Sequence, residues 1–152
     1  MRAPNARDTA LRVLVSCRTA GAWADAALRA QLRRDGLSGP EAALCSRIVY
    51  GVMQNRLLLD FYIGKFSTTR PEKMEIKVRN ALRLGVYQMA FMTKIPHNAA
   101  VNESVELTKK HCKNPRAGGM VNGILRNLAR HLDELPTLDR GNPVAYLSLL
   151  YS

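Results

Sequence analysis

The sequence predicts an all-α protein, and three observations lead to this prediction. Apolar residues recur at intervals of three and four along almost every segment, as they do on the buried face of a helix. Stretches in which apolar and polar residues alternate, as in a half-buried strand, are missing. Glycine and proline mark the places where one periodic segment gives way to the next. We therefore expect a bundle of about six or seven helices.

The first two helices are predicted from apolar spacing and from the turns that follow them. The stripe of the first helix, at spacing i, i+3, i+4 and i+7, consists of Ala10, Val13, Leu14 and Cys17. A turn near Ala20-Gly21 follows it. The second helix runs from about Trp23 to Arg34. Asp35-Gly36 ends it, because glycine readily adopts the backbone conformation that terminates a helix.

The third segment starts at Ser38-Gly39-Pro40-Glu41, a pattern typical of a capping box with proline in the first turn. Two apolar stripes follow, formed by Cys45, Ile48, Val49 and Val52 and by Leu59, Tyr62, Ile63 and Phe66. They indicate either one long helix or two helices with a break near Asn55-Arg56. Thr68 to Pro71 ends the segment.

Three more helices complete the predicted bundle. One spans about Met74 to Met92, and Ile95-Pro96 separates it from the next, which runs from about His97 to Lys113. Asn114 to Gly119 is predicted to be a loop, and the last helix covers Met120 to Leu132.

Three glycines, Gly51, Gly85 and Gly123, fall inside predicted helices. Each costs about 1 kcal/mol relative to alanine there. We expect close helix packing to be the compensation.

The net charge is the most unusual property of the chain. Its 152 residues contain 23 Lys and Arg against 12 Asp and Glu, a formal charge of +11 that is spread along the whole length. A small domain this basic favours a polyanionic partner, which composition alone leaves open as RNA, DNA or an anionic membrane. No apolar run approaches the length of a membrane span, and the N-terminus lacks a secretory signal, so we expect a cytoplasmic protein without a membrane partner.

Motifs for catalysis and metal binding are missing. The sequence lacks the glycine-rich phosphate loops, the paired-histidine zinc motif and the serine nucleophile motif. Its three cysteines, Cys17, Cys45 and Cys112, form no C-x-x-C pair and are predicted to be small core residues. We therefore expect no catalytic residue, no metal ligand and no cofactor within these 152 residues.

Clustered basic residues are the candidates for contact with a polyanion. The predicted phosphate-binding residues are Arg7, Arg12, Arg18, Lys113, Arg116 and Arg126. Arginine suits bidentate contact with phosphate, and an aromatic content of 6% argues against a platform for stacking bases. Arg116-Ala117-Gly118-Gly119 precedes a helix and is either an anion-binding helix start or an ordinary connection.

Three polar residues, Asn102, Glu103 and Asn122, lie beside the apolar stripes of the last two helices. Burial of such groups is costly unless they are hydrogen-bonded. A structural polar network between these helices is favoured over direct contact with a ligand.

The segment from Ile95 to Leu107, Ile-Pro-His-Asn-Ala-Ala-Val-Asn-Glu-Ser-Val-Glu-Leu, resembles the NusB family of helical RNA-binding domains. The match continues in Val121-Asn122-Gly123-Ile124-Leu125-Arg126 and covers about residues 5–132. This resemblance implies a NusB-like helical bundle in two parts, whose N-terminal arginine-bearing helix touches RNA.

The family has two functional branches, and the sequence favours one of them. Arg126, the segment Leu82 to Gln88 and the segment Tyr146 to Ser152 resemble the N-terminal part of the Sun/Fmu (RsmB)-type rRNA cytosine-C5 methyltransferases. This resemblance implies an RNA-binding domain over residues 1–132 and, over 133–152, a linker to a methyltransferase domain absent from this chain. It also implies that the parent enzyme uses S-adenosylmethionine and that the partners are rRNA and that C-terminal domain.

Two alternatives stay open. The other branch contains free-standing transcription antitermination factors, which bind a ribosomal-RNA leader together with a ribosomal protein. A third interpretation is a protein-interaction domain whose charge serves only solubility.

Overall fold

The computed structural model describes residues 4–17 and 22–135, and over these residues the chain is all-α, as predicted. The elements are α1 (Ala6–Ser16), α2 (Ala22–Asp35), α3 (Gly39–Gln54), α4 (Arg56–Phe66), η1 (Pro71–Lys73), α5 (Ile76–Phe91), α6 (His97–His111), α7 (Ala117–Arg130) and η2 (Leu132–Glu134), where η marks a short 3-10 helix. Within the described ranges, no helix is both long and apolar enough to cross a bilayer.

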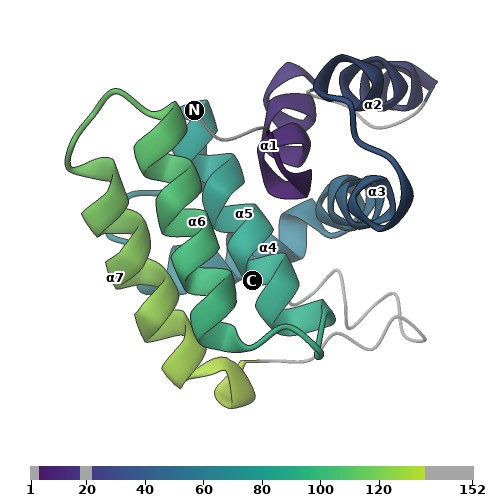
Figure 1. Ribbon diagram of the computed structural model, residues 1–152. Coiled ribbons are helices and arrows are strands. Elements are labelled where there is room, and N and C mark those ends of the chain that lie inside the picture. The colour runs from purple at the N-terminus through teal and green to yellow at the C-terminus, as the bar shows by residue number, and fades with distance from the viewer. Residues whose placement is uncertain (1–3, 18–21, 136–152) are drawn as a thin grey trace.

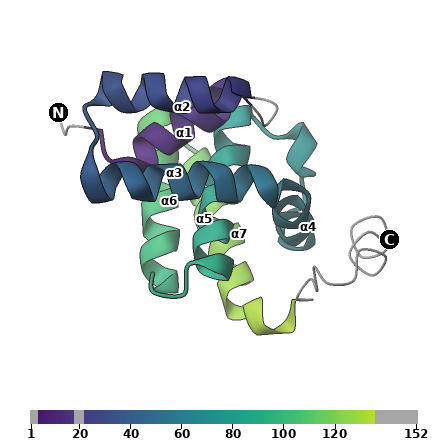
Figure 2. The ribbon, with the colours of Figure 1, turned by 90° about the vertical axis from the view of Figure 1, so that its right-hand side faces the viewer.

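The helices form two groups, which Figure 1 shows side by side. In one group α5, α6 and α7 pack against each other, and α4 packs against α5 and α7. In the other, α1 packs against both α2 and α3 (Figure 2). The groups are joined through α5, which contacts α1 and α3 as well as its own neighbours.

The helix α5 lies at the centre of the core. Its buried side chains point in several directions and include Val78, Leu82, Leu84, Val86 and Met89. A helix that is apolar on most sides is covered on most sides by its neighbours. This central position explains why residues 76–91 show a broader apolar pattern than the single stripe of a surface helix.

The capping box predicted at the start of α3 is wrong. Ser38 is the N-cap residue, but its side chain makes no capping hydrogen bond. Oε2 of Glu41 instead accepts a hydrogen bond from the backbone N–H of Ala6, at 2.9 Å. A capping box does form at α1, where Asn5 and Asp8 each accept from the other's backbone N–H.

Two helix boundaries that the sequence left open or misplaced are clear in the structure. The segment from Gly39 to Phe66 is two helices, and Asn55 between them donates from Nδ2 to the carbonyl oxygen of Gly51, at 2.8 Å. The loop predicted over Asn114 to Gly119 is shorter, because α7 begins at Ala117. The predicted linker from residue 133 begins within η2 and continues to the buried Leu135, and its remainder, 136–152, lies outside the described residues.

The predicted core role of the cysteines is confirmed for Cys17 and Cys45, which are buried, whereas Cys112 is half-buried. Burial, together with the nearby charges of Asp35 and Glu41, raises the pKa of the Cys45 thiol to about 12. Cys45 is therefore a protonated, apolar packing group rather than a reactive thiolate.

Candidate nucleic-acid interface

The first turn of α1 meets the last turn of α6 at a buried carboxylate, Asp8, whose side chain is 3% exposed. Its Oδ2 accepts from Nζ of Lys110 at 3.1 Å and from the backbone N–H of Asn5 at 3.0 Å. Its Oδ1 lies 2.9 Å from Nε2 of His111. Burial acts to raise the pKa of Asp8, but these hydrogen bonds and the charge of Lys110 outweigh it and lower the pKa. Asp8 is thus an anionic link between two helices about one hundred residues apart in the chain.

A second contact extends this junction to α5. Nζ of Lys77 donates to the backbone carbonyl oxygen of His111, at 3.2 Å. Lys77 and His111 also line, with Arg12 and Gln31, a groove of about 340 Å³ between these helices. Three helices therefore contribute basic side chains to one place.

The turn that leaves α6 adds two more cations, because Lys113 and Arg116 follow His111 within five residues and both are exposed. We use the name α1–α6 basic surface for five side chains, namely Arg12, Lys77, Lys110, Lys113 and Arg116. Its positive charges come from α1, α5, α6 and the turn between α6 and α7. Chemically, such a surface supplies hydrogen-bond donors and positive potential to a polyanion.

Arg12 is held in place by Asp35, the last residue of α2. Nη1 of Arg12 lies 3.0 Å from Oδ2 of Asp35, which also accepts from the hydroxyl of Thr9 at 2.7 Å. Oδ1 of Asp35 accepts from Nε2 of Gln31 at 3.1 Å. Burial again acts to raise the pKa of Asp35, but these hydrogen bonds and Arg12 lower it. Asp35 orients Arg12 and offsets part of its charge.

The remaining predicted phosphate-binding residues are placed differently. Arg7 is half-buried, and its Nε donates to Oε1 of the fully buried Gln88, at 2.8 Å. Arg18 lies outside the described residues. Arg126 is exposed on α7, ten residues beyond Arg116 and so about 15 Å further along the helix axis. Of the predicted residues, Arg12 lines the groove beside His111, Lys113 and Arg116 lie on the exposed turn between α6 and α7, and Arg126 lies further along α7.

The predicted network of Asn102, Glu103 and Asn122 is not formed among the described residues. Asn102 is exposed, so water can satisfy its amide and no protein partner is needed. Oδ1 of Asn122 accepts from Nε of Arg126 on the same helix, at 2.8 Å. Asn102 and Asn122 do line one groove between α6 and α7, whereas Glu103 lines a different groove beside Asp8.

The sequence alone does not identify Lys77 and Lys110 as members of the basic surface. Lys110 stands in a visible cluster with Lys109 and Lys113, but periodicity alone does not show which of them faces α1. Lys77 stands at the start of the most buried helix, two residues before Arg79, and nothing in its local sequence shows that it faces α6. Only the packing of α1 against α5 and α6 reveals both.

Comparison with known proteins gives a family match over most of the chain. Residues 4–130 match the model of the NusB family. The chain is 33% identical over 139 residues to the probable ribosomal RNA small subunit methyltransferase B of Bacillus subtilis, in an alignment that covers 91% of this chain and 30% of that protein. It therefore spans less than a third of the length of this relative.

Other similarities point to shorter proteins. The transcription antitermination protein NusB of Dictyoglomus thermophilum is 41% identical over 100 residues, which are 65% of this chain and 69% of that protein. Among solved structures, the crystal structure of antitermination factors NusB and NusE in complex with dsRNA superposes with a TM-score of 0.72 and 24% identity. That superposition covers 82% of this chain and 93% of the other, and it shows a shared fold.

Proposed function

The chain belongs to the NusB family, and from this premise we propose that it binds RNA through the α1–α6 basic surface. The observation that carries the proposal is the Asp8 junction, which holds Lys110 and His111 of α6 against α1. Because Asp8 is buried, its carboxylate organises the surrounding cations without presenting a negative charge to a ligand. A solved relative that was crystallised with dsRNA supports a nucleic-acid partner.

We further propose that the chain is the N-terminal domain of an S-adenosylmethionine-dependent rRNA cytosine-C5 methyltransferase and helps to dock its rRNA. The support is the Bacillus subtilis relative, whose match extends over more of this chain than the family domain does. The methyl donor and the catalytic groups would belong to the part of the protein beyond this chain. The α1–α6 basic surface would contribute binding energy and orientation rather than chemistry.

A free-standing antitermination factor is the second candidate. The similarity to the Dictyoglomus thermophilum protein favours it, because identity there reaches 41%. This candidate shares the RNA-binding proposal and differs only in what the protein does once RNA is bound.

RNA binding is tested by titrating the 152-residue chain with a single-stranded RNA at several salt concentrations. Each phosphate contacted changes the slope of log K against log salt by about −0.7, so four contacts lower the association constant about fiftyfold between 50 and 200 mM salt. Arg12→Gln is expected to flatten the slope by about one contact, whereas Arg130→Gln, an exposed arginine at the far end of α7, leaves it unchanged. Weak binding that does not vary with salt would contradict the proposal.

The two candidate functions are separated with the full-length product of the gene. If the protein is a methyltransferase, incubation with small-subunit rRNA and labelled S-adenosylmethionine transfers label to a cytosine. A reading frame that stops after Ser152, or a longer product that transfers no label, would instead favour the antitermination factor.

A further inference from the structure

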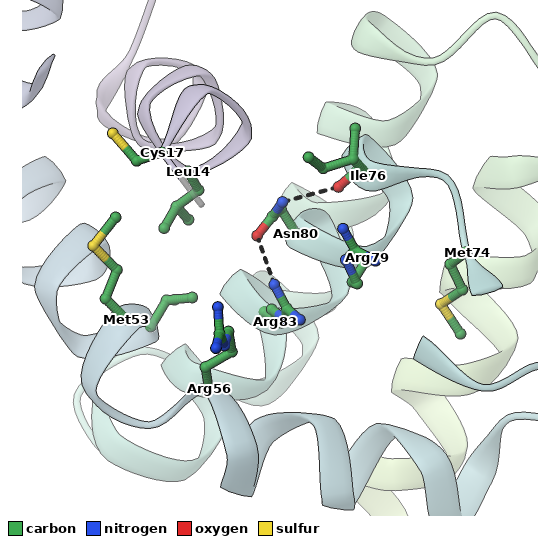
Figure 3. A pocket seen from close by; sticks show the side chains of 10 residues that line it. Leu14, Cys17, Met53, Arg56, Met74, Ile76, Arg79, Asn80 and Arg83 are labelled. Carbon is green, nitrogen blue, oxygen red and sulfur yellow. Dashed lines mark hydrogen bonds between the residues drawn. The ribbon is translucent and has the colours of Figure 1, made fainter. Parts of the chain in front are cut away.

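A second basic site lies on the other side of the end of α1, in a pocket of about 610 Å³ between α1, α3, α4 and α5 (Figure 3). Three arginines line it: Arg56 from the first residue of α4, and Arg79 and Arg83 from α5. No acidic residue stands among the described residues that line the pocket. Nothing in the sequence brings these arginines together, since Arg56 and Arg79 are 23 positions apart.

Arg83 forms a rigid part of the pocket wall. Its Nε and Nη2 donate to the two carboxylate oxygens of Asp60, each at 2.7 Å. Its Nη1 donates to Oδ1 of Asn80 at 3.3 Å, and Nδ2 of Asn80 donates to the carbonyl oxygen of Ile76 at 2.9 Å (Figure 3). Asp60 offsets the charge of Arg83, and Nη1 of Arg79 donates to the carbonyl oxygen of Pro71, at 3.5 Å.

The rest of the lining is apolar and includes Leu14, Met53 and Met74. A phosphate alone gains nothing from such a wall, whereas a nucleobase does, because burying apolar surface is favourable. Methionine side chains adapt to flat, polarisable groups, and guanidinium groups bind phosphate in a bidentate way. The pocket therefore offers an anion site and a site for a base side by side, at a volume typical of small-ligand sites.

The pocket and the α1–α6 basic surface lie on opposite sides of the same short stretches of chain. Leu14 and Cys17 of α1 line the pocket, while Arg12 and Ser16 line the groove beside His111. On α5 the pocket residue Ile76 is followed directly by the groove residue Lys77. A strand that crosses the end of α1 can therefore contact both.

We propose that this pocket receives one unpaired nucleotide of the bound RNA, with its phosphate on the side that bears the three arginines and its base against Leu14, Met53 and Met74. This inference rests on the proposed RNA-binding function and adds a specific subsite to it. Such a subsite gives the protein a preference for RNA with an unpaired base at one position along the strand. Phosphate contacts alone do not provide this selectivity.

The first test uses NMR of the 152-residue chain labelled at its methionine methyl groups. Uridine 5′-monophosphate, added to about 10 mM because one nucleotide supports only weak affinity, is expected to shift the Met53 and Met74 signals. The signals of Met89 and Met120, which do not line the pocket, are expected to stay in place. Inorganic phosphate is expected to move Met53 and Met74 much less. No shift with the nucleotide, or equal shifts with phosphate, overturns the assignment of a nucleotide site.

The second test measures RNA affinity of two variants that alter the pocket in different ways. Arg56→Gln removes an exposed charge, and Met53→Trp fills the pocket at constant charge; each is expected to weaken binding of single-stranded RNA about five- to tenfold. Arg130→Gln serves as the matched arginine control, and circular dichroism confirms that each variant is folded. Wild-type binding with no loss in either folded variant overturns the subsite and leaves the proposed function standing. If the wild-type protein does not bind RNA but the nucleotide shifts the Met53 and Met74 signals, the proposed function is overturned and the pocket remains a nucleotide site.

Discussion

Asp8 is a charged side chain in a buried position, with 2% of the residue exposed. Such a group is stable only when hydrogen bonds and opposite charges replace the water it has lost. Asn5, Lys110 and His111 provide them, from the N-cap of α1 and from the end of α6. The same side chain therefore caps one helix and docks another.

Replacing Asp8 with asparagine is expected to destabilise the fold. The amide keeps the size of the side chain but places N–H groups against the donors Lys110 and His111, both of which lose their anionic partner. Because Lys110 remains partly solvated, the expected loss is about 2 kcal/mol in the free energy of unfolding, measured by urea denaturation. Asp133→Asn, at an exposed position in η2, is the control and is expected to change stability by less than about 0.5 kcal/mol.

The pH dependence of stability reports on the same carboxylate. The pKa of Asp8 is lowered from its ordinary value of 3.8 in the folded state, so its contribution is complete above that value and is lost as the pH falls through the folded pKa. Wild-type stability is therefore expected to fall below about pH 4, and Asp8→Asn to show a smaller loss over the same range. Some acid sensitivity remains in the variant, because the pKa of Asp35 is lowered as well. Parallel curves for the two proteins would contradict the assignment.

At the level of helices, the expected close packing at internal glycines is confirmed for two of three. A Cβ on Gly51 would overlap the ring of Tyr87, and one on Gly85 would lie 2.6 Å from Oγ of Ser104. Gly123 has open space at the same position. The close packing of α3 on α5 and of α5 on α6 thus requires glycine at positions 51 and 85. The packing of α7 does not require glycine at position 123.

Gly51→Ala and Gly123→Ala are therefore expected to change stability in opposite directions. The ring of Tyr87 is buried and stacked on Phe91, so it has little room to move aside, and Gly51→Ala is expected to cost about 2 kcal/mol or more. Gly123→Ala is expected to add about 0.5 to 1 kcal/mol, since alanine favours the helix and meets nothing. Thermal unfolding of both variants measures the difference, and stabilisation by Gly51→Ala would show that the α3–α5 contact is looser than the structure indicates.

For the molecule as a whole, the important feature is that one surface is assembled from both helical groups. Arg12 belongs to the group of α1, α2 and α3, whereas Lys77 and Lys110 belong to the group of α4, α5, α6 and α7. The formal charge of +11 is spread along the sequence, so a concentrated field arises only where packing joins these helices.

A pair of double charge reversals tests whether position or total charge governs RNA binding. Lys113→Glu with Arg116→Glu alters the α1–α6 basic surface, whereas Lys94→Glu with Arg130→Glu makes the same change in net charge near the start of α6 and the end of α7. The first pair is expected to lower RNA affinity more than about tenfold at 100 mM salt, and the second less than about threefold. Equal losses in a filter-binding assay would mean that net charge alone attracts the RNA.

The helices, the family and the basic character of the protein can be inferred from the chain without coordinates. Helical hydrogen bonds and apolar periodicity are local, so α2, α5, α6 and α7 can be predicted from the sequence with ends correct to within a few residues. Two short motifs, around Asn102 and around Asn122, mark the family, and each of them is a contiguous stretch of sequence.

Packing alone decided which polar groups meet. The carboxylate of Glu41 could accept either from the backbone at the start of its own helix or from the backbone N–H of Ala6. It accepts from Ala6, because α1 packs against α3. Asp8 links α1 to α6, and Arg56 and Arg79 line one pocket, although in each case the residues are far apart in the chain. Such contacts depend on the relative placement of whole helices, which the core of α5 sets, and no local pattern contains that information.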